Sequence, residues 1–141
     1  MFESLYPTMQ WANYRSTWPH AQHSQFIQAG GIQWHVQIMG QGPVLLLLHG
    51  TGSGSFSWRG LMPLLSAHFQ VIAPDLPGHA FTSRGPEGSL SMQGMSEGLR
   101  ALLLQLNVTP SIIGGHSAGA AIAANMLLQQ RALSQTQLIG F

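Results

Sequence analysis

Apolar residues recur along the chain at two different intervals, every second residue and every third or fourth. Residues 32–39 (IQWHVQIM) alternate as a strand does, and a Gly30-Gly31 turn connects them to residues 26–29. Residues 44–48 (VLLLL) form an unbroken apolar run, which predicts a strand buried on both faces of a mostly parallel sheet. Further strands are predicted at residues 69–73, 111–114 and 137–141.

Helical spacing separates these predicted strands. Residues 91–107 carry apolar side chains at intervals of three and four, which predicts an amphipathic helix packed on the core. Helices are also expected at about 57–68 and 117–131. Because strands and helices alternate, we expect an α/β fold, a three-layer sandwich around a mostly parallel sheet. Residues 1–25 have no clear period and are expected to be an irregular leader that packs aromatic side chains onto a domain formed by residues 26–141.

The composition narrows the class of function. The 141 residues are enough for one domain, and 45% of them are hydrophobic, which is enough for a core. The chain has no lysine, and its five arginines are scattered and nearly balanced by four acidic residues, so no nucleic-acid surface is expected. The apolar run is far too short to cross a bilayer, so no transmembrane segment is expected. The first twenty residues do not resemble a signal peptide and cysteine is absent, which favours a cytoplasmic location.

The glycine- and serine-rich segment HGTGSGS, residues 49–55, has features of nucleotide-binding loops. A phosphate-binding loop needs a lysine, which the chain lacks. The dinucleotide fingerprint is a closer match, because Gly50 and Gly52 follow a strand and Asp75 ends the next one. Its third glycine is replaced by Ser55, however, so this interpretation is disfavoured. No cofactor is predicted, and no metal-ligand spacing such as H-E-x-x-H occurs.

A catalytic signature, G-x-S-x-G, stands at Gly115-His116-Ser117-Ala118-Gly119. It follows an apolar strand and opens an alanine-rich helix, and this strand-turn-helix setting is the one that exposes a nucleophilic serine. The backbone of such a serine is strained, and the residues two positions away must be small, as Gly115 and Gly119 are. The alternative is a serine that only caps the helix after a glycine turn. The setting favours Ser117 as a nucleophile.

The segment His49-Gly50-Thr51-Gly52 supplies the second half of such a site. Acyl transfer needs N–H donors directed at the oxyanion that develops during the reaction. In hydrolases with this serine motif, one donor is the N–H after the nucleophile, here Ala118, and the other comes from the loop after an earlier strand. In that loop the Thr51 N–H is the best candidate. Both loops follow the C-terminal ends of parallel strands, where α/β sheets bind ligands.

These motifs resemble those of the α/β-hydrolase superfamily and, within it, of the magnesium-chelatase accessory proteins of bacteriochlorophyll biosynthesis. The resemblance implies an α/β-hydrolase fold, a nucleophile at Ser117 and oxyanion donors at Thr51 and Ala118. It also implies a cytoplasmic protein of phototrophic bacteria that is linked to magnesium insertion into protoporphyrin. The matching stretches cover most of residues 26–130 and read GGIQWHVQIMGQGPVLLLLHGTGSGSFSWRGLMPLL, FQVIAPDLPGHAFTS, LSMQGM and GGHSAGAAIAANM.

The chain departs from the superfamily pattern after Ser117. The triad acid and histidine follow the serine in this fold, but no Asp, Glu or His follows Ser117 here. Of the earlier candidates, Asp75 is expected to brace the turn before Pro77-Gly78, and His116 is expected to point away from the serine. His49 and His79 are expected to pack their loops. We therefore expect residues 1–141 to be the N-terminal part of a longer hydrolase.

Two functions remain open at this point. The first is a serine hydrolase that acts on an ester-like carbonyl of a small-molecule substrate. The second is a non-catalytic accessory protein whose cleft binds a porphyrin or a magnesium-chelatase subunit. For that second role, the leader offers Trp11, Tyr14 and Trp18 as side chains that could contact a partner or an apolar ring.

Overall fold

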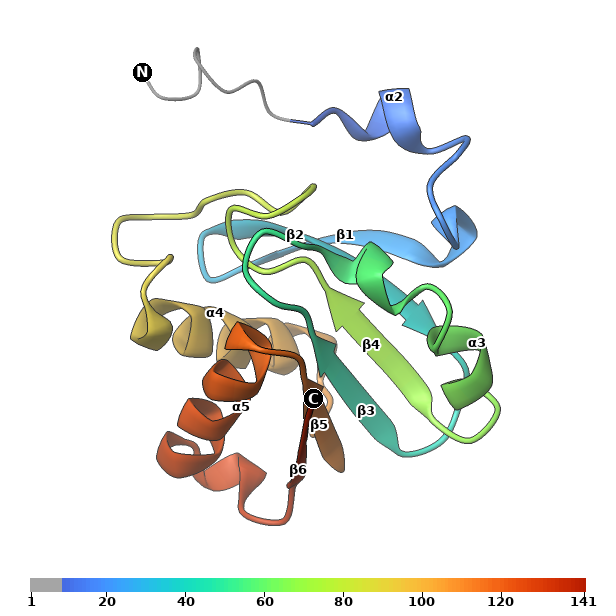
Figure 1. The fold of residues 1–141 in the computed structure, drawn as a ribbon. Coiled ribbons are helices and arrows are strands. Elements are labelled where there is room, and N and C mark those ends of the chain that lie inside the picture. Colours follow the sequence, from blue (N-terminus) through green and yellow to red (C-terminus); the bar gives the residue numbers. More distant parts are fainter. Residues whose placement is uncertain (1–8) are drawn as a thin grey trace.

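The computed structural model describes residues 9–141, which form a six-stranded sheet with helices on both faces (Figure 1). The order of strands across the sheet is β1-β2-β4-β3-β5-β6. The most apolar strand, β3, therefore lies inside the sheet, with a partner on each side. The strands are β1 Ser24–Ala29, β2 Ile32–Met39, β3 Val44–Leu48, β4 Gln70–Pro74, β5 Ile112–Gly115 and β6 Gln137–Gly140.

One strand of the sheet, β2, runs opposite to the other five. Strand β2 runs antiparallel to both β1 and β4, whereas β3, β4, β5 and β6 are mutually parallel. Leu46 of β3 pairs with Ile72 on one side and with Ile113 on the other, and all three side chains are buried. This arrangement confirms the predicted α/β fold with a mostly parallel sheet.

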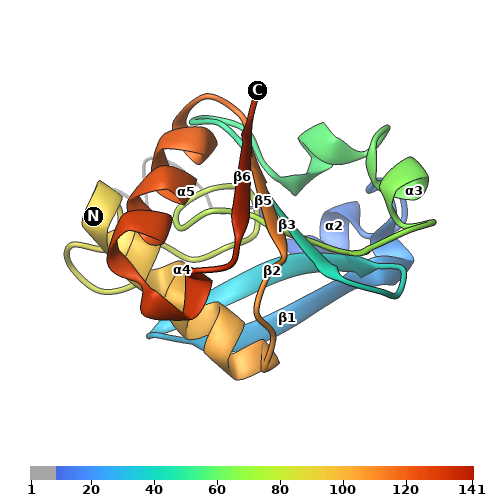
Figure 2. The same ribbon diagram turned by 90° about the horizontal axis from the view of Figure 1, so that it is seen from below.

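Helices cover the two faces of the sheet unequally. The long helices α4 (Met92–Leu106) and α5 (Ala118–Gln129) lie on one face, and the short α3 (Met62–Leu65) lies on the other (Figure 2). Each face has its own buried cluster: Leu99 and Ile122 belong to the first, and Trp58 and Met62 to the second. The result is the expected three-layer sandwich. The remaining helical turns are α2 Trp11–Tyr14, η1 Ala21–His23, η2 Ser55–Trp58 and η3 Arg131–Leu133.

The helix predicted at 57–68 is wrong as a single element. The structure has a 3₁₀ turn, η2, and then the one-turn helix α3, with Gly60 between them. Pro63 stands in the first turn of α3, where its missing N–H is tolerated; further into a helix it would remove a hydrogen bond. The helix predicted at 91–107 is confirmed, because Ser91 caps its N-terminus through its side chain and Asn107 ends it in a left-handed conformation.

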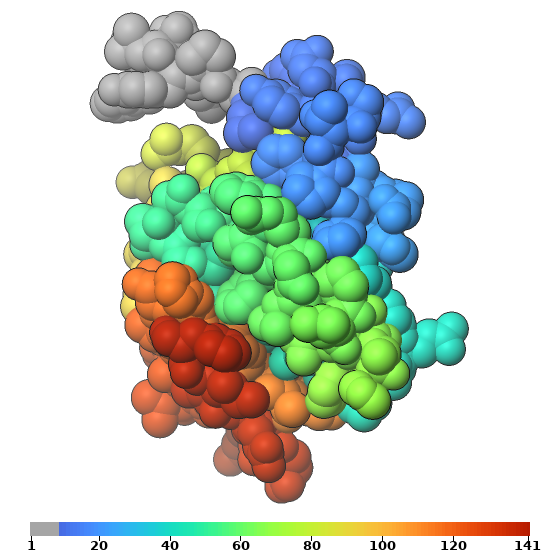
Figure 3. Space-filling model, turned by 45° about the vertical axis from the view of Figure 1, so that its right-hand side comes forward, coloured from blue at the N-terminus to red at the C-terminus, as the bar shows by residue number. Residues whose placement is uncertain are grey.

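The described part of the leader packs closely against the domain. The rings of Trp11 and Trp18 meet Phe81 edge to face, with ring centroids 5.0 and 4.7 Å apart. Figure 3 shows the described part of the leader, in blue, at one end of the molecule, and the C-terminal segment, in dark red, at the surface of another part. The segment is less irregular than expected, since it contains α2 and η1 and since β1 begins at Ser24. Residues 1–8 of the expected leader lie outside the described residues.

Candidate active site

Ser117 occupies the sharp turn between β5 and α5 in a conformation that is rare for a serine. Its φ and ψ are 56° and −118°, close to a turn position that favours glycine. Although Ser117 stands at the N-cap position, its side chain makes no capping hydrogen bond. The alternative of a helix-capping serine therefore does not describe this residue. The side chain is exposed, so its hydroxyl is free to meet a ligand.

The two glycines of the serine motif allow this turn to pack under β3. A Cβ atom on Gly119 would collide with the carbonyl oxygen of Leu48. A Cβ atom on Gly115 would lie 2.5 Å from the main-chain nitrogen of Ala120. Both collisions involve backbone atoms, which cannot rotate away. The glycines are therefore needed for the close approach of α5 to the sheet, as the motif predicts.

The 49–55 loop follows β3 and lies directly beside Ser117. A Cβ atom on Gly50 would be 3.4 Å from the Cβ of Ser117 and 3.4 Å from the carbonyl oxygen of His116. Thr51 and Ala118 line the same cavity, which has a volume of about 330 Å³. The structure thus brings the two predicted motifs together, and it places both proposed oxyanion donors at the wall of one cavity.

His49 holds the start of this loop. Its Nε2 accepts a hydrogen bond of 2.9 Å from the Leu76 N–H, so Nδ1 carries the proton and donates to the Gly50 carbonyl oxygen at 2.7 Å. Burial lowers the pKa of His49 below its usual value, against the opposing effect of the Gly50 carbonyl. With both ring nitrogens engaged, His49 is a neutral structural residue. The expectation that it packs the loop is confirmed.

Asp75 holds the other end of the loop. Its carboxylate accepts hydrogen bonds from the Ser55 N–H at 2.7 Å and the Phe81 N–H at 3.1 Å, and it pairs with His35 Nδ1 at 2.7 Å. Burial favours the protonated acid, but the bond and charge of His35 and the two N–H groups together lower the pKa of Asp75. Asp75 thus has a role beyond the expected bracing of the Pro77-Gly78 turn, because it also orients the imidazole of His35.

The imidazole of His35 was missed by the sequence analysis. Both His35 and Asp75 are fully buried, and His35 Nε2 lies 2.8 Å from Ser24 Oγ. The order Ser24–His35–Asp75 is that of a catalytic triad, but Ser24 Oγ also accepts a hydrogen bond from Gln37 Nε2 at 3.2 Å, and Ser24 pairs with Gln37 in the sheet. We interpret the group as a buried network that ties β1 and β2 to the 49–55 loop.

A signal for this network was present in the sequence. His35 occupies an interior position of β2, and a buried histidine needs a polar partner. Asp75 is the only aspartate of the chain. These two observations name Asp75 as one candidate partner of His35, but only the order of strands in the sheet brings the two together.

Within residues 9–141, no histidine makes a side-chain hydrogen bond to the hydroxyl of Ser117. The four histidines that make side-chain hydrogen bonds there bond to other partners. His79, whose ring lies 5.1 Å from that of His49, bonds through Nδ1 to the Pro77 carbonyl oxygen at 3.0 Å. Across the same residues there is no group of three potential metal ligands. Nor is any helix there long and apolar enough to cross a membrane.

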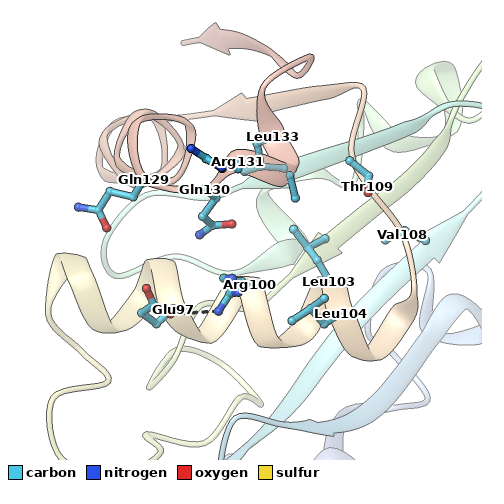
Figure 4. A pocket seen from close by; sticks show the side chains of 11 residues that line it. Glu97, Arg100, Leu103, Leu104, Val108, Thr109, Gln129, Gln130, Arg131 and Leu133 are labelled. Atoms are coloured by element: carbon cyan, nitrogen blue, oxygen red, sulfur yellow. Dashed lines mark ion pairs between the residues drawn. The ribbon is translucent and has the colours of Figure 1, made fainter.

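A second pocket lies away from this site, between α4 and the end of α5 (Figure 4). It has a volume of about 400 Å³ and shares no lining residue with the cavity at Thr51 and Ala118. Arg100 and Arg131 line it, and Arg100 forms an exposed ion pair of 3.9 Å with Glu97. Exposed pairs of this kind contribute little to stability.

Comparison with known proteins identifies related sequences and folds. The α/β-hydrolase fold family profile matches residues 43–135. The magnesium-chelatase 30 kDa subunit of Rhodobacter capsulatus is 43% identical over 115 residues, which are 80% of this chain and 40% of that protein. The 2-hydroxy-6-oxo-2,4-heptadienoate hydrolase of Pseudomonas putida is 33% identical over 107 residues, which are 74% of this chain and 39% of that protein.

Solved structures give the same picture. An epoxide hydrolase from Vigna radiata superposes with a TM-score of 0.71 at 30% identity, over 77% of this chain and 35% of that one. A hydrolase-fold protein from Nostoc superposes with a TM-score of 0.75 at 24% identity, over 83% of this chain and 41% of that one. The chain thus spans 35% to 41% of the length of these four proteins.

Proposed function

The chain belongs to the α/β-hydrolase fold family, and from this premise we propose that it carries the nucleophile and oxyanion site of a serine hydrolase. Ser117 would be the nucleophile, and the N–H groups of Thr51 and Ala118 would bind the oxyanion. His49, Gly50, Gly52, Gly115, His116 and Gly119 would support this site through the shape of the two loops. The substrate would be a small molecule with an ester-like carbonyl, and we expect the protein to act in the cytoplasm.

The reaction would follow the usual course of acyl transfer. Ser117 Oγ attacks the carbonyl carbon while its proton passes to a general base, and the carbonyl oxygen becomes an oxyanion. The C–O bond to the alcohol then breaks, the alcohol leaves with a proton, and a water molecule hydrolyses the acyl-serine. Since no Asp, Glu or His follows Ser117 within residues 1–141, we propose that a further segment of the full-length protein supplies the acid and the base.

The observation that supports the proposal best is the meeting of two motifs that lie more than sixty residues apart. The turn at Ser117 is strained and its hydroxyl is not used for capping. The 49–55 loop lies so close to it that a Cβ atom added to Gly50 would be 3.4 Å from the Cβ of Ser117. A strained conformation of about 1–3 kcal/mol persists only where the surrounding structure enforces it, and such residues cluster at functional sites.

The proposal is tested in the full-length protein with a fluorophosphonate probe and a model ester. We expect the probe to label Ser117, and Ser117→Ala to lower turnover about 10⁴- to 10⁶-fold without unfolding the protein. Ser134→Ala is the matched control, because Ser134 is exposed and follows the C-terminal end of α5, away from the turn. This variant should keep the original probe labelling and ester turnover. Unchanged ester turnover in Ser117→Ala would remove Ser117 from the mechanism.

A second function is favoured by the similarity to a magnesium-chelatase subunit. In this alternative the protein is a non-catalytic accessory factor for magnesium insertion in bacteriochlorophyll biosynthesis, and its cleft binds a porphyrin or a chelatase subunit. The leader offers Tyr14 for such contacts, since its side chain is 38% exposed. Porphyrin binding that survives Ser117→Ala, together with absent probe labelling, would support this role over hydrolysis.

A further inference from the structure

We propose that the substrate of this site carries an uncharged, apolar acyl group and that this group occupies the 330 Å³ cavity beside Thr51 and Ala118. The inference rests on the proposed serine-hydrolase function, because it assumes that the reacting carbonyl lies at the oxyanion donors. It adds the chemical class of the substrate, which the catalytic motifs do not specify.

The walls of the cavity are largely apolar. Leu76 comes from the loop after β4, Leu90 from the loop before α4, Met92 and Met95 from the start of α4, and Ile122 from α5. Among the described residues that line it, there is no Asp, Glu, Lys or Arg. A charged acyl group would lose its hydration there without finding a counter-charge, and that loss is costly. The cavity therefore selects against charged acyl groups.

Within residues 9–141, the wall contains one titratable side chain, His79, and one of its ring nitrogens makes a hydrogen bond. His79 Nδ1 bonds to the Pro77 carbonyl oxygen at 3.0 Å, and the His79 ring packs at 5.1 Å from the buried His49 ring. These contacts of His79 stabilise the loop after β4.

The entrance of the cavity is apolar as well. Leu90 and Met92 are 42% and 45% exposed, although they are large hydrophobic side chains. Gly78 stands opposite Leu90, and a Cβ atom there would lie 3.1 Å from Leu90 Cδ2. Gly78 has a φ of 75°, which residues with a side chain rarely adopt. Since glycine has no side chain, this side of the cavity stays open. An acyl chain that enters here covers Leu90 and Met92 as it binds.

The volume limits the size of the acyl group. Small-molecule sites commonly span about 300 to 1,000 Å³, so this cavity is at the lower end of that range. It suits a short or medium-length chain. Each methylene buried contributes about 0.8 kcal/mol, which corresponds to roughly a fourfold gain in binding per added carbon.

The experiment uses the full-length protein and p-nitrophenyl esters of acetate, butyrate, hexanoate and succinate. We expect kcat/KM to rise about 15-fold with each pair of carbons from acetate to hexanoate, and the negatively charged succinyl ester to react at least about tenfold more slowly than the butyryl ester. A flat profile, or faster reaction of the succinyl ester, would overturn the inference.

Failure of this inference can be distinguished from failure of the proposed function. If Ser117→Ala abolishes turnover but the acyl profile is flat, only the substrate class is wrong. If Ser117→Ala hydrolyses the esters at the original rate, the nucleophile is wrong. Absence of turnover with every ester would overturn both proposals.

Two variants link the profile to this cavity. Met95→Trp fills the cavity from α4, and we expect the hexanoyl-to-acetyl ratio of kcat/KM to fall at least about tenfold. Leu104→Trp is the matched control, because Leu104 lies on the same helix, is 68% exposed and lines the other pocket (Figure 4). If Met95→Trp does not fold, Leu90→Asp at the exposed entrance should lower the same ratio. An unchanged ratio in folded Met95→Trp or Leu90→Asp would contradict the proposal.

Discussion

The carboxylate of Asp75 accepts a hydrogen bond of 2.7 Å from the main-chain N–H of Ser55, twenty residues earlier in the chain. Asp75→Asn should therefore lower the free energy of unfolding by about 3 kcal/mol, because it leaves His35 without its charged partner and sets an amide N–H₂ among other donors. Urea denaturation of the full-length protein measures this change. The control Glu97→Gln, at an exposed pair of 3.9 Å, should cost less than about 1 kcal/mol. Equal costs would show that the buried network is not important for stability.

The stability of the protein should decrease as the pH falls from neutral, because of His49. Burial lowers the pKa of His49 below 6.5 in the folded state, so the unfolded chain binds a proton that the native protein does not. The stability contributed by neutral His49 is thus complete above about pH 6.5 and is lost progressively below it. Urea denaturation between about pH 8 and about pH 5 should show a shallower dependence for His49→Gln. The exposed His68→Gln serves as the control, and the expectation is wrong if the two variants behave alike.

Gly119→Ala should disrupt the packing of α5 on β3. The added Cβ meets the carbonyl oxygens of Leu48 and His49, so the helix must move away from the sheet. We expect a loss of about 2 to 3 kcal/mol in the free energy of unfolding and a loss of probe labelling at Ser117. Gly60→Ala is a matched control, since nothing lies within 4 Å of its added Cβ. Comparable stability of the two variants would contradict the close approach.

Ser117→Gly should be more stable than Ser117→Ala, although glycine is ordinarily the poorer residue in folded structure. The φ of 56° is strained for any residue with a side chain, and glycine relieves that strain. We expect a difference of about 1 kcal/mol in the free energy of unfolding, with both variants equally inactive. Thermal denaturation of the two proteins side by side measures it. If Ser117→Ala is the more stable variant, the turn is not strained.

Residues 1–141 produced alone should hydrolyse esters poorly and should self-associate. Strand β6 pairs with β5 on one side only, and Leu138, Ile139 and Phe141 are 40%, 46% and 62% exposed. Such an edge can pair with another chain, and only 6% of the residues are charged. Ile139→Lys should reduce association at micromolar concentrations in analytical ultracentrifugation. A monomer that hydrolyses esters through Ser117 would contradict this expectation.

Much of the fold could be predicted because the strands have unambiguous patterns. The bounds of β2 and β3 agree with the alternation of residues 32–39 and the apolar run 44–48. The break in the helix at 57–68 was missed because apolar residues recur at helical spacing across Gly60 and Pro63, namely Trp58, Leu61, Leu64 and Leu65. Apolar spacing indicates which face of a segment is buried, but it does not indicate whether the backbone hydrogen bonds of a helix continue through that segment.

The site could be predicted only where local motifs describe it. The positions of Thr51 and Ala118 at one cavity follow from two loops that leave neighbouring parallel strands. The pair of His35 and Asp75 belongs to no motif, and forty residues separate its members. Contacts of this kind depend on the order of strands in the sheet, which periodicity does not determine. The role of Ser117 as a nucleophile stays a prediction.

The hydrogen bonds of Asp75 also have a consequence for synthesis on the ribosome. All of its partners, the last of which is Phe81, precede the serine turn in the chain. Chains emerge from the N-terminus and fold as they emerge. Strands β1 to β4 and the 49–55 loop can therefore assemble while Ser117 is still inside the exit tunnel. Strand β5 then pairs with β3. Ser117 therefore reaches its position only after the 49–55 loop beside it has folded.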